Sequence, residues 1–320
     1  MPQSSVTLLI IAYRMRATIA DAVRAALAQT LPCEIIISDD SSGDGSLDIV
    51  REVIDGYDGP HRVRVRSTGC NVGLCEHINQ LAAEATGDIL VCASGDDIAY
   101  PQRVERLAAV LAADPRVQLV GSAVDDVDAA GHLIAAGVRG LPARIDQRWL
   151  LRRGKLASVL GASLAFRRSL VTDLPPLAGK VEDNMLTLRA ALLGECACLP
   201  EALLAYRRHD ANLGDWVFDR RTAGYAGFEQ RHRRVLSMYR EIAADQERCL
   251  AALPDLDPER RRLGAELARL YRLEADMREA ILDLPRHHWL APLGRGLMQR
   301  GLRRKSAERA LKLLLPRRWF

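Results

Sequence analysis

The sequence predicts an α/β fold in which a mainly parallel, twisted β-sheet is covered by helices on both faces, with a helical extension at the C-terminal end. Three observations support this prediction. Short apolar runs alternate with amphipathic stretches up to residue 124, which is the pattern of βαβ units. Two of these runs end directly in a pair of aspartates, at the position where such sheets bind ligands. Beyond Gly214 the sequence is helical and strongly charged.

The strands of the first half are indicated by their apolar runs. Residues 6–12 and 34–38 suit buried strands, whereas residues 61–67 alternate Val with Arg and suit a half-exposed strand. Further strands are expected at residues 88–93 and 117–124. Helices are expected at residues 18–31 and 46–56, from the turn at 71–73 to residue 85, and from Pro101, a favoured first helical residue, to residue 114.

The middle of the chain has a mixed pattern. Here we expect a hairpin at residues 127–138 that turns at Ala130-Gly131, a strand at 162–166, a helix at 183–193 and a strand at 197–206. Later, an apolar stripe near helical spacing predicts long helices, and its members are Leu263, Leu267, Leu270, Met277 and Ile281. We therefore expect a sheet domain over residues 1–213 and a helical, basic extension over residues 214–320.

Composition and charge narrow the class of protein. A hydrophobic content of 48% and a charged content of 27% are those of an ordinary globular protein, and no run approaches the roughly 18 apolar residues of a membrane span. The formal net charge is +4, yet residues 281–320 hold ten Arg and Lys against two acids. The seven cysteines are odd in number and lack metal-binding spacing, so we expect reduced, packed thiols in a cytoplasmic protein.

Two aspartate pairs are the most informative feature of the chain. Asp39 and Asp40 follow the run at 34–38, and Asp96 and Asp97 follow the run at 88–93. Carboxylates gathered at one sheet edge repel one another unless a cation or ligand offsets their charge. Acidic oxygen sites suit Mg²⁺ or Mn²⁺, which typically combine one or two carboxylates with substrate phosphates. The pairs therefore predict a metal-bound phosphate ester such as a nucleotide, although each pair also suits a simple turn or helix cap.

The order and spacing of motifs over residues 5–210 resemble glycosyltransferase family 2, whose members have the GT-A fold and use nucleotide-diphospho-sugar donors. The matching segments are Ile-Ile-Ala-Tyr-Arg (10–14), Ala-Gln-Thr (28–30), Asp-Asp-Ser-Ser-Gly-Asp-Gly-Ser (39–46), Asn-Val-Gly (71–73) with Asn79, Ala-Thr-Gly-Asp (85–88), Glu-Asp (182–183) and Tyr-Arg-Arg-His (206–209). Two positions depart from the family. The Asn that follows the first Tyr is Arg14 here, and the first Asp of the Asp-x-Asp metal motif is Ser94.

The resemblance implies a role for each motif. Asp183 is expected to act as the general base and Glu182 to position the acceptor, in a single displacement that inverts the anomeric centre. A divalent cation, Mg²⁺ or Mn²⁺, is expected on Asp96, Asp97 and His209. The residues expected to bind the nucleotide-sugar donor are Ala12, Tyr13, Arg14, Asp39, Asp40, Ser41, Asn71, Asp96 and Arg207.

Other interpretations stay open on sequence grounds. Asp183 also suits an ordinary first-turn helix acid, and His209 a solvated histidine. A degenerate transferase that serves as a scaffold would account for Arg14 and Ser94. A sugar nucleotidyltransferase is a further alternative, but residues 13–16 lack the glycine-rich loop of that class. We expect no nucleic-acid partner, because the basic segment carries no recognised motif.

The basic segment near the end of the chain contains an amphipathic pattern. Ala307, Ala310, Leu311, Leu314 and Leu315 share one helical face. On this pattern Lys305, Arg309 and Lys312 point away from that face, which suits a helix lying on an anionic membrane. We therefore expect a protein that is peripheral on the inner face of the cytoplasmic membrane, with a glycan or lipid-linked glycan as acceptor. The alternatives are that this helix packs on its own protein or that the long helices pair between chains.

Overall fold

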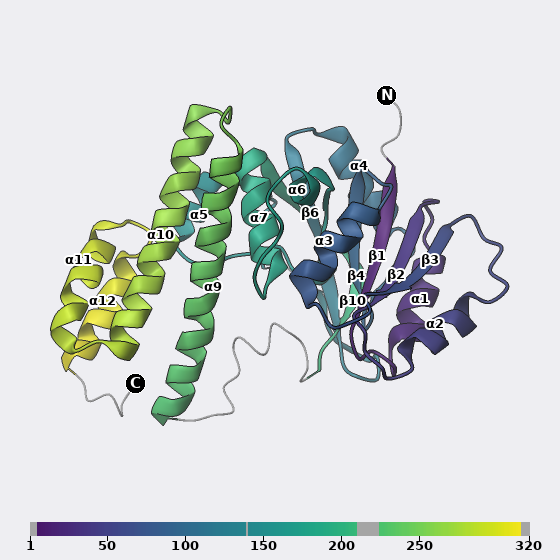
Figure 1. Cartoon of the computed structure of the whole chain (residues 1–320), viewed down its shortest axis with the longest axis horizontal. Coiled ribbons are helices and arrows are strands. Elements are labelled where there is room, and N and C mark those ends of the chain that lie inside the picture. Colours follow the sequence, from purple (N-terminus) through teal and green to yellow (C-terminus); the bar gives the residue numbers. More distant parts are fainter. Residues whose placement is uncertain (1–4, 139, 210–223, 315–320) are drawn as a thin grey trace. The chain divides into compact units, whose positions relative to one another are not determined.

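The computed structural model describes residues 5–138, 140–209 and 224–314 (Figure 1). The chain divides into two compact units. The sheet unit comprises residues 1–145 and 158–209, and the helical unit comprises residues 146–157 and 210–320. The predicted boundary between residues 213 and 214 lies outside the described residues. The short segment 146–157, which the sequence pattern had grouped with the sheet, belongs to the helical unit.

The sheet unit is built on a ten-stranded sheet in the order β3-β2-β1-β4-β9-β6-β10-β5, with β7 beside β6 and β8 beside β10. Its strands are β1 (Val6–Ala12), β2 (Glu34–Asp39), β3 (Arg62–Ser67), β4 (Ile89–Ser94), β5 (Ile98–Ala99), β6 (Val117–Val127), β7 (Leu133–Val138), β8 (Arg144–Ile145), β9 (Ala165–Arg167) and β10 (Glu195–Arg207). Strands β3, β2, β1 and β4 are parallel, as predicted. The short β9 pairs antiparallel with both β4 and β6, so the second half of the sheet is mixed rather than parallel.

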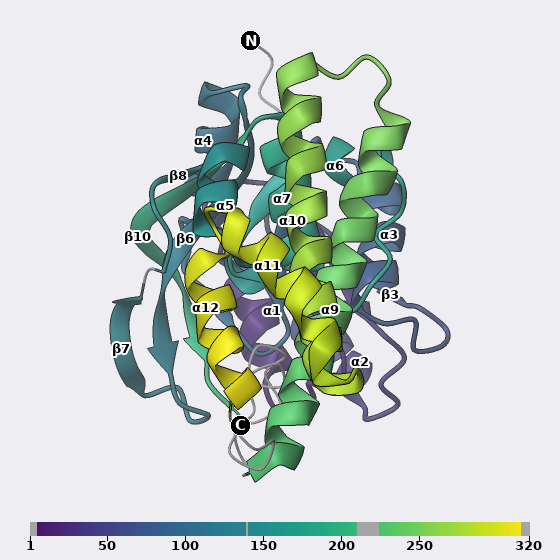
Figure 2. The same ribbon diagram turned by 90° about the vertical axis from the view of Figure 1, so that its left-hand side faces the viewer.

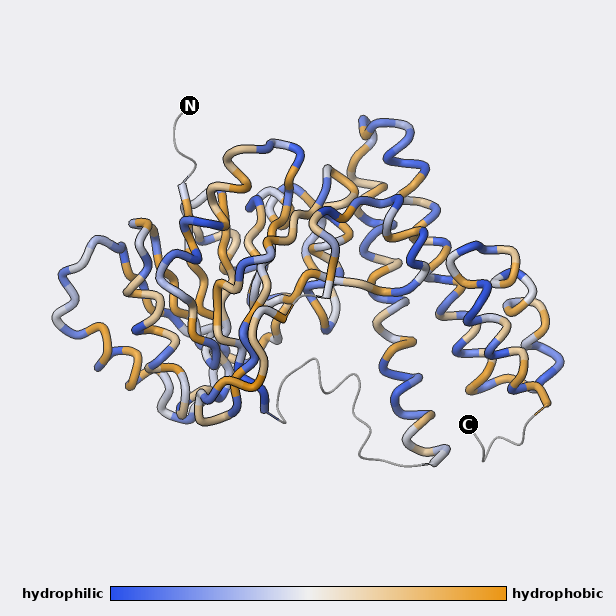
Figure 3. Tube along the Cα trace, turned by 180° about the vertical axis from the view of Figure 1, so that it is seen from behind, coloured by the Kyte–Doolittle hydropathy of each residue, from blue (hydrophilic) through white to orange (hydrophobic). Residues whose placement is uncertain are grey.

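Helices cover the sheet, which confirms the predicted α/β class. They are α1 (Ile19–Leu27), α2 (Ser46–Ile54), α3 (Leu74–Glu84), α4 (Arg103–Ala113), α6 (Ser169–Thr172) and α7 (Glu182–Leu193), with a 3₁₀ turn, η1, at Gly161–Ser163. One apolar core joins α1 and α4 to alternate strand residues such as Ile10, Ile37 and Val91. Because successive strand side chains point to opposite faces, the intervening residues, also buried, form the second face. Hydrophobic character is concentrated along these strands in Figure 3.

The parallel register brings the predicted functional loops to one edge of the sheet. Ala12 pairs with Asp39 across β1 and β2, and Ile11 pairs with Ser94 across β1 and β4. The Asp40 backbone N–H donates to the Ala12 carbonyl at 2.8 Å, and the Gly95 N–H donates to the Ile11 carbonyl at 3.1 Å. The carboxyl ends of β1, β2 and β4 therefore lie side by side.

The helical unit contains a hairpin of two long helices, α9 (Gly224–Ala252) and α10 (Pro258–Asp283), seen side by side in Figure 2. Asp257 caps α10 by accepting hydrogen bonds from two backbone N–H groups of its first turn, and Pro258 fills the following position. The unit also contains α5 (Gln147–Arg153), η2 (Arg286–Trp289), α11 (Leu290–Met298), α12 (Arg303–Leu311) and η3 (Lys312–Leu314). No helix within residues 5–138, 140–209 and 224–314 is long and apolar enough to cross a membrane.

The orientation of α12 differs from the prediction. Arg309 and Lys305, expected to face solvent, point inward and form ion pairs with Glu274 of α10, at 2.7 Å for Arg309 and 3.3 Å for Lys305. Leu311 and Leu314 are instead exposed, and Leu315 lies outside the described residues. The physical reason is the buried carboxylate of Glu274, since an acid taken out of water needs opposite charge beside it.

Candidate active site

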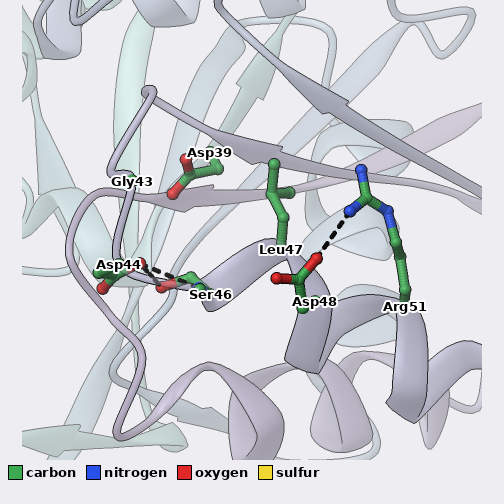
Figure 4. A pocket seen from close by; sticks show the side chains of 8 residues that line it. Asp39, Gly43, Asp44, Ser46, Leu47, Asp48 and Arg51 are labelled. Atoms are coloured by element: carbon green, nitrogen blue, oxygen red, sulfur yellow. Dashed lines mark hydrogen bonds and ion pairs between the residues drawn. The ribbon is translucent and has the colours of Figure 1, made fainter.

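The loop that follows β2 is held by Asp39. The Ser42 backbone N–H donates to Asp39 Oδ2 at 2.8 Å, and the Ser42 hydroxyl donates to Asp39 Oδ1. Ser42 Oγ in turn accepts the backbone N–H of Arg14 at 2.7 Å, which ties the loop after β1 to the loop after β2. Asp39 also lines a hollow of about 270 Å³ at the start of α2, with Gly43, Asp44, Ser46 and Arg51 around it (Figure 4).

The Asp40 carboxylate accepts hydrogen bonds from the loop at residues 71–73. Its buried carboxylate accepts the backbone N–H groups of Val72 and Gly73, both at 2.9 Å, and the side-chain amide of Asn71 at 3.1 Å. The Thr68 hydroxyl lies 2.9 Å from the same carboxylate. Asp40 and Asn71, both predicted to bind the donor, are therefore brought together. In this structure they bond to each other and fix the entry to α3.

Tyr13 and Arg14 form an exposed platform beside Asp39. The Arg14 guanidinium carbon lies 5.1 Å from the centre of the Tyr13 ring, a cation–π geometry. Arg14 adopts φ = +57° and Ser41 φ = +55°, in the left-handed region that residues other than Gly, Asn and Asp seldom occupy. The Ser41 hydroxyl lies 3.3 Å from the hydroxyls of both Ser67 and Thr68. Backbone strain of this kind gathers at functional sites.

The second aspartate pair lies against the end of β10. Asp96 Oδ2 is 2.7 Å from His209 Nε2, and Asp97 Oδ1 accepts the backbone N–H of Arg207 at 2.9 Å. The other oxygen of Asp97 is buried and has no hydrogen-bond partner within the part of the chain that the structure describes. Burial, followed by repulsion from Asp96, raises the pKa of Asp97 to about 7. The structure thus brings Asp96 and His209 into contact, but within the described residues no three His, Cys, Asp or Glu side chains lie close enough together to hold a metal ion.

The Arg207 guanidinium contacts two backbone carbonyls and lies 3.7 Å from the Asp21 carboxylate. Nε donates to the Asp96 carbonyl at 2.9 Å, and NH1 donates to the Ala129 carbonyl at 2.6 Å, in the hairpin turn between β6 and β7. The side chain is buried, so this geometry favours a role in holding the aspartate pair. A contact between Arg207 and the donor diphosphate stays a prediction.

A second buried arginine, Arg103, had no signal in the sequence beyond an ordinary helix start. It donates to the carbonyls of Cys92, in β4, and Ala162, in η1, both at 2.6 Å. Burial lowers the pKa of Arg103 to about 10, with Cys92 and Asp97 among the opposing charges. Arg103 therefore links the strand that carries the aspartate pair to the loop before β9.

Glu182 and Asp183 begin α7, as the motif predicted. The Ser158 hydroxyl donates to Asp183 Oδ2 at 2.7 Å, and Asn184 donates to Asp183 Oδ1 through its backbone N–H at 2.6 Å and its amide at 2.8 Å. Burial and the neighbouring Asp183 raise the pKa of Glu182 to about 8, and burial also raises the pKa of Asp183. Ser158 was missed because it lies 25 residues from Asp183 and belongs to no recognised motif.

The unit therefore combines a mixed α/β sheet with two aspartate pairs that follow adjacent parallel strands of that sheet, and a third acidic pair begins α7, which is the architecture of GT-A-type transferases. The family model for glycosyl transferase family 2 matches residues 7–174. The chain belongs to this family.

Relatives agree with that assignment. The putative glycosyltransferase EpsE of Bacillus subtilis (strain 168) is 30% identical over 131 residues, which are 41% of this chain and 45% of EpsE. The probable glycosyltransferase YdaM of the same strain is 28% identical over 168 residues, 50% of this chain and 40% of YdaM. The chain thus spans less than half the length of these two relatives.

Solved structures share the fold. S. aureus TarS 1–349 in complex with UDP-GlcNAc matches with a TM-score of 0.59 and 16% identity, over 97% of this chain and 89% of that one. The mannosyltransferase PcManGT from Pyrobaculum calidifontis, in complex with GDP-Man and Mn²⁺, matches with a TM-score of 0.54 and 17% identity, over 98% and 88% of the two chains.

Proposed function

We propose that the protein is an inverting, metal-dependent glycosyltransferase that moves a sugar from a nucleotide-diphosphate donor to a hydroxyl of a glycan or lipid-linked glycan. The observation that carries the proposal is that Asp39 and the Asp96-Asp97 pair follow the two strands that flank β1, in a unit that also contains Asp183 and whose fold is shared with nucleotide-sugar-bound proteins. We keep the prediction of a cytoplasmic protein, because the odd number of cysteines and their spacing fit no paired framework.

The donor site is proposed at the loops after β1 and β2. Asp39 is oriented by Ser42 and offers acceptor lone pairs to a base or ribose. Tyr13 is 39% exposed and offers an aromatic face on which a base can stack, with the Arg14 cation above it. Asp40 and Asn71 hold the adjoining loop in place.

The metal residues fit a divalent cation. Asp97 has a buried oxygen without a partner in the described chain, and Asp96 offers a second carboxylate beside it. Across the described residues, no three His, Cys, Asp or Glu side chains are gathered closely enough to hold a metal alone. This matches a cation such as Mg²⁺, which binds one or two carboxylates and takes its other ligands from substrate phosphates and water. When bound, such a cation supplies positive charge to the leaving diphosphate.

Asp183 is proposed as the general base. It takes the proton of the acceptor hydroxyl as that oxygen bonds to the anomeric carbon and the bond to the donor diphosphate breaks, which inverts the centre. Ser158 and Asn184 fix the orientation of the carboxylate. Its raised pKa makes it a stronger proton acceptor than an ordinary aspartate. Base catalysis of this kind contributes about 10²–10⁴-fold.

The first test is donor binding. Purified protein is heated with UDP, GDP, dTDP or CMP, each with and without Mn²⁺ or Mg²⁺, and a metal-dependent rise in melting temperature with one nucleotide is expected. A ligand at about 100 times its Kd stabilises by about 2.7 kcal/mol. Cys70 gives a second readout, because it is the one exposed cysteine of the seven and adjoins Asn71, so bound nucleotide is expected to slow its labelling by a thiol reagent.

The second test separates transfer from scaffolding. Asp183→Asn is expected to keep nucleotide binding and lose transfer by at least about 10²-fold, whereas Asp96→Ala is expected to lose metal-dependent binding itself. Full transfer activity in both variants would refute the assigned mechanism. Absence of any nucleotide shift or Cys70 protection in the unsubstituted protein would favour a degenerate scaffold instead.

A further inference from the structure

The helical unit exposes an unusual number of large apolar side chains in one short segment. Of the eleven that are exposed in the described residues, six lie between residues 284 and 314. The most exposed are Met298 at 83%, Leu314 at 81% and Leu311 at 63%. Clustered exposure of this kind marks a binding surface more often than chance solvent exposure does.

The helix α12 buries polar side chains and exposes apolar ones, which is the reverse of an ordinary surface helix. It buries Ser306 and Arg309 against α10, where Arg309 pairs with Glu274, and it turns Ala307 and Leu311 outward. A helix that served only its own core would place its leucines inward and its arginine outward. The structure therefore leaves an apolar face of α12 exposed within the described residues.

The neighbouring helix, α11, also exposes apolar side chains. The helix α11 buries Leu293 and Gly296 and exposes Leu290, Leu297 and Met298. Two bonds hold α11 and the end of the described chain in place, since Arg303 Nε donates to the Leu297 carbonyl at 3.2 Å and Arg286 donates to the Leu313 carbonyl at 2.8 Å. Figure 2 shows α11 and α12 beside each other and next to α10.

The charge of this layer indicates the partner. Residues 286–314 contain eight Arg and Lys and a single acid, Glu308. Arg309 and Lys305 are engaged by Glu274, whereas Arg295, Arg300 and Arg304 are exposed on the same segment as the apolar side chains, with Arg304 beside Glu308 and Arg295 beside Asp276. Exposed leucines, an exposed methionine and exposed arginines on one segment suit the interface of an anionic bilayer, where apolar groups enter the acyl boundary and cations meet phosphate headgroups.

We propose that the outward faces of α11, α12 and η3, here called the tail surface, dock on an anionic membrane. The tail surface is defined by Leu290, Leu297, Met298, Leu311 and Leu314 with Arg295, Arg300 and Arg304. This proposal depends on the exposed residues of the helical unit and not on the donor chemistry proposed for the sheet unit.

The test is sedimentation of the full chain with vesicles, in the absence of any nucleotide. Vesicles of phosphatidylcholine alone are compared with vesicles that also contain phosphatidylglycerol, at low and high salt. The protein is expected to bind only the anionic vesicles and to be released by salt. Replacing Met298, Leu311 and Leu314 with Ser is expected to weaken binding by on the order of tenfold or more.

Matched controls come from the same chain. Leu133 and Ile134 of β7 are 63% and 59% exposed, and replacing both with Ser is expected to leave vesicle binding within about twofold of the unsubstituted protein. Arg300→Gln with Arg304→Gln is expected to weaken binding about 25-fold, at about fivefold for each charge. Arg240→Gln with Arg262→Gln, exposed arginines of α9 and α10, is the charge control.

Three outcomes would overturn the proposal. If the triple Ser variant bound vesicles as well as the unsubstituted protein, the apolar side chains of the tail surface would not contribute to binding. If only the β7 variant lost binding, the membrane-binding surface would lie at β7 and not at the tail surface. A dimer in light scattering that the triple Ser variant dissociates, without vesicle binding by either protein, would assign the surface to a second copy of the chain. Circular dichroism and melting of every variant establish that the fold is intact.

Discussion

Asp40→Ala is expected to destabilise the sheet unit while Asp39→Ala, one residue earlier, does so far less. In the structure Asp40 accepts two backbone N–H groups, from Val72 and Gly73, and the Asn71 amide. A donor left without its acceptor costs about 1–3 kcal/mol when buried, and this loop is partly open to water. We therefore expect a loss of about 2–4 kcal/mol for Asp40→Ala, most of it from the two backbone groups.

The neighbouring substitution serves as the matched control. The Asp39 carboxylate accepts only from Ser42 in the described contacts, and removing its charge also relieves repulsion with Asp40, so we expect a loss of about 1 kcal/mol. Asp39→Ala is instead expected to abolish the nucleotide-induced rise in melting temperature. The two substitutions should therefore have different effects: Asp39→Ala should impair nucleotide binding, and Asp40→Ala should loosen the loop at residues 71–73.

The assay is urea unfolding without nucleotide, with labelling of Cys70 as a local probe. For a unit of this size, 2–4 kcal/mol lowers the melting temperature by about 4–16 °C. Cys70 lies within the loop that Asp40 holds, so its labelling is expected to accelerate in Asp40→Ala below the unfolding transition. A loss under about 1 kcal/mol together with unchanged labelling would show that the Asp40 bonds contribute little.

Three further substitutions test separate features. Arg14→Asn is expected to stabilise the protein by about 0.5–1 kcal/mol in urea unfolding, because Asn tolerates the φ of +57° better than Arg does; a loss of stability would contradict the strain argument. Glu182 has a raised pKa, of about 8, so the stability it contributes is present below its ordinary pKa and is lost as pH rises toward 8. The stability of Glu182→Gln relative to the unsubstituted protein should therefore increase between pH 5 and pH 9, and a constant difference would refute this. Glu274→Gln leaves Arg309 and Arg278 without their buried counter-charge and is expected to cost about 3–5 kcal/mol near pH 7, whereas a cost under 1 kcal/mol would show that the pairs are dispensable.

The sequence predicted the parallel half of the sheet because its signals are local. Runs such as Ile35–Ile37 are apolar without interruption, and the aspartates that follow them mark the strand ends. The hairpin of β6 and β7 was predicted for the same reason, from a turn at residues 130–131. These elements need no knowledge of distant residues.

Contacts between distant residues could not be predicted in this way. The side of α12 that is buried is decided by Glu274, which lies 35 residues from Arg309. The partners of Asp40 lie 28 to 33 residues away, and nothing in the pair Asp39-Asp40 shows from sequence which of the two acids anchors a neighbouring loop and which is proposed to bind the donor. The sequence motif located the candidate site, but the division of labour within it depends on tertiary hydrogen bonds.

The same division constrains how a diphosphate can bind. Arg207 and Arg103, the two buried arginines closest to the aspartate pair in their contacts, donate to backbone carbonyls and so help to hold the pair in place. The charges of Arg103 and Arg207 act on the carboxylate of Asp97, and Arg14 is an exposed cation beside Asp39. A diphosphate would add further negative charge to this acidic edge, so we propose that a divalent cation accompanies it, and donor binding is expected to depend on Mg²⁺ or Mn²⁺ even in Arg14→Asn. Equal nucleotide affinity with and without a chelator would mean that positively charged side chains, and not a metal ion, neutralise the diphosphate. To contact the diphosphate, Arg207 would then have to break its hydrogen bonds to the backbone carbonyls.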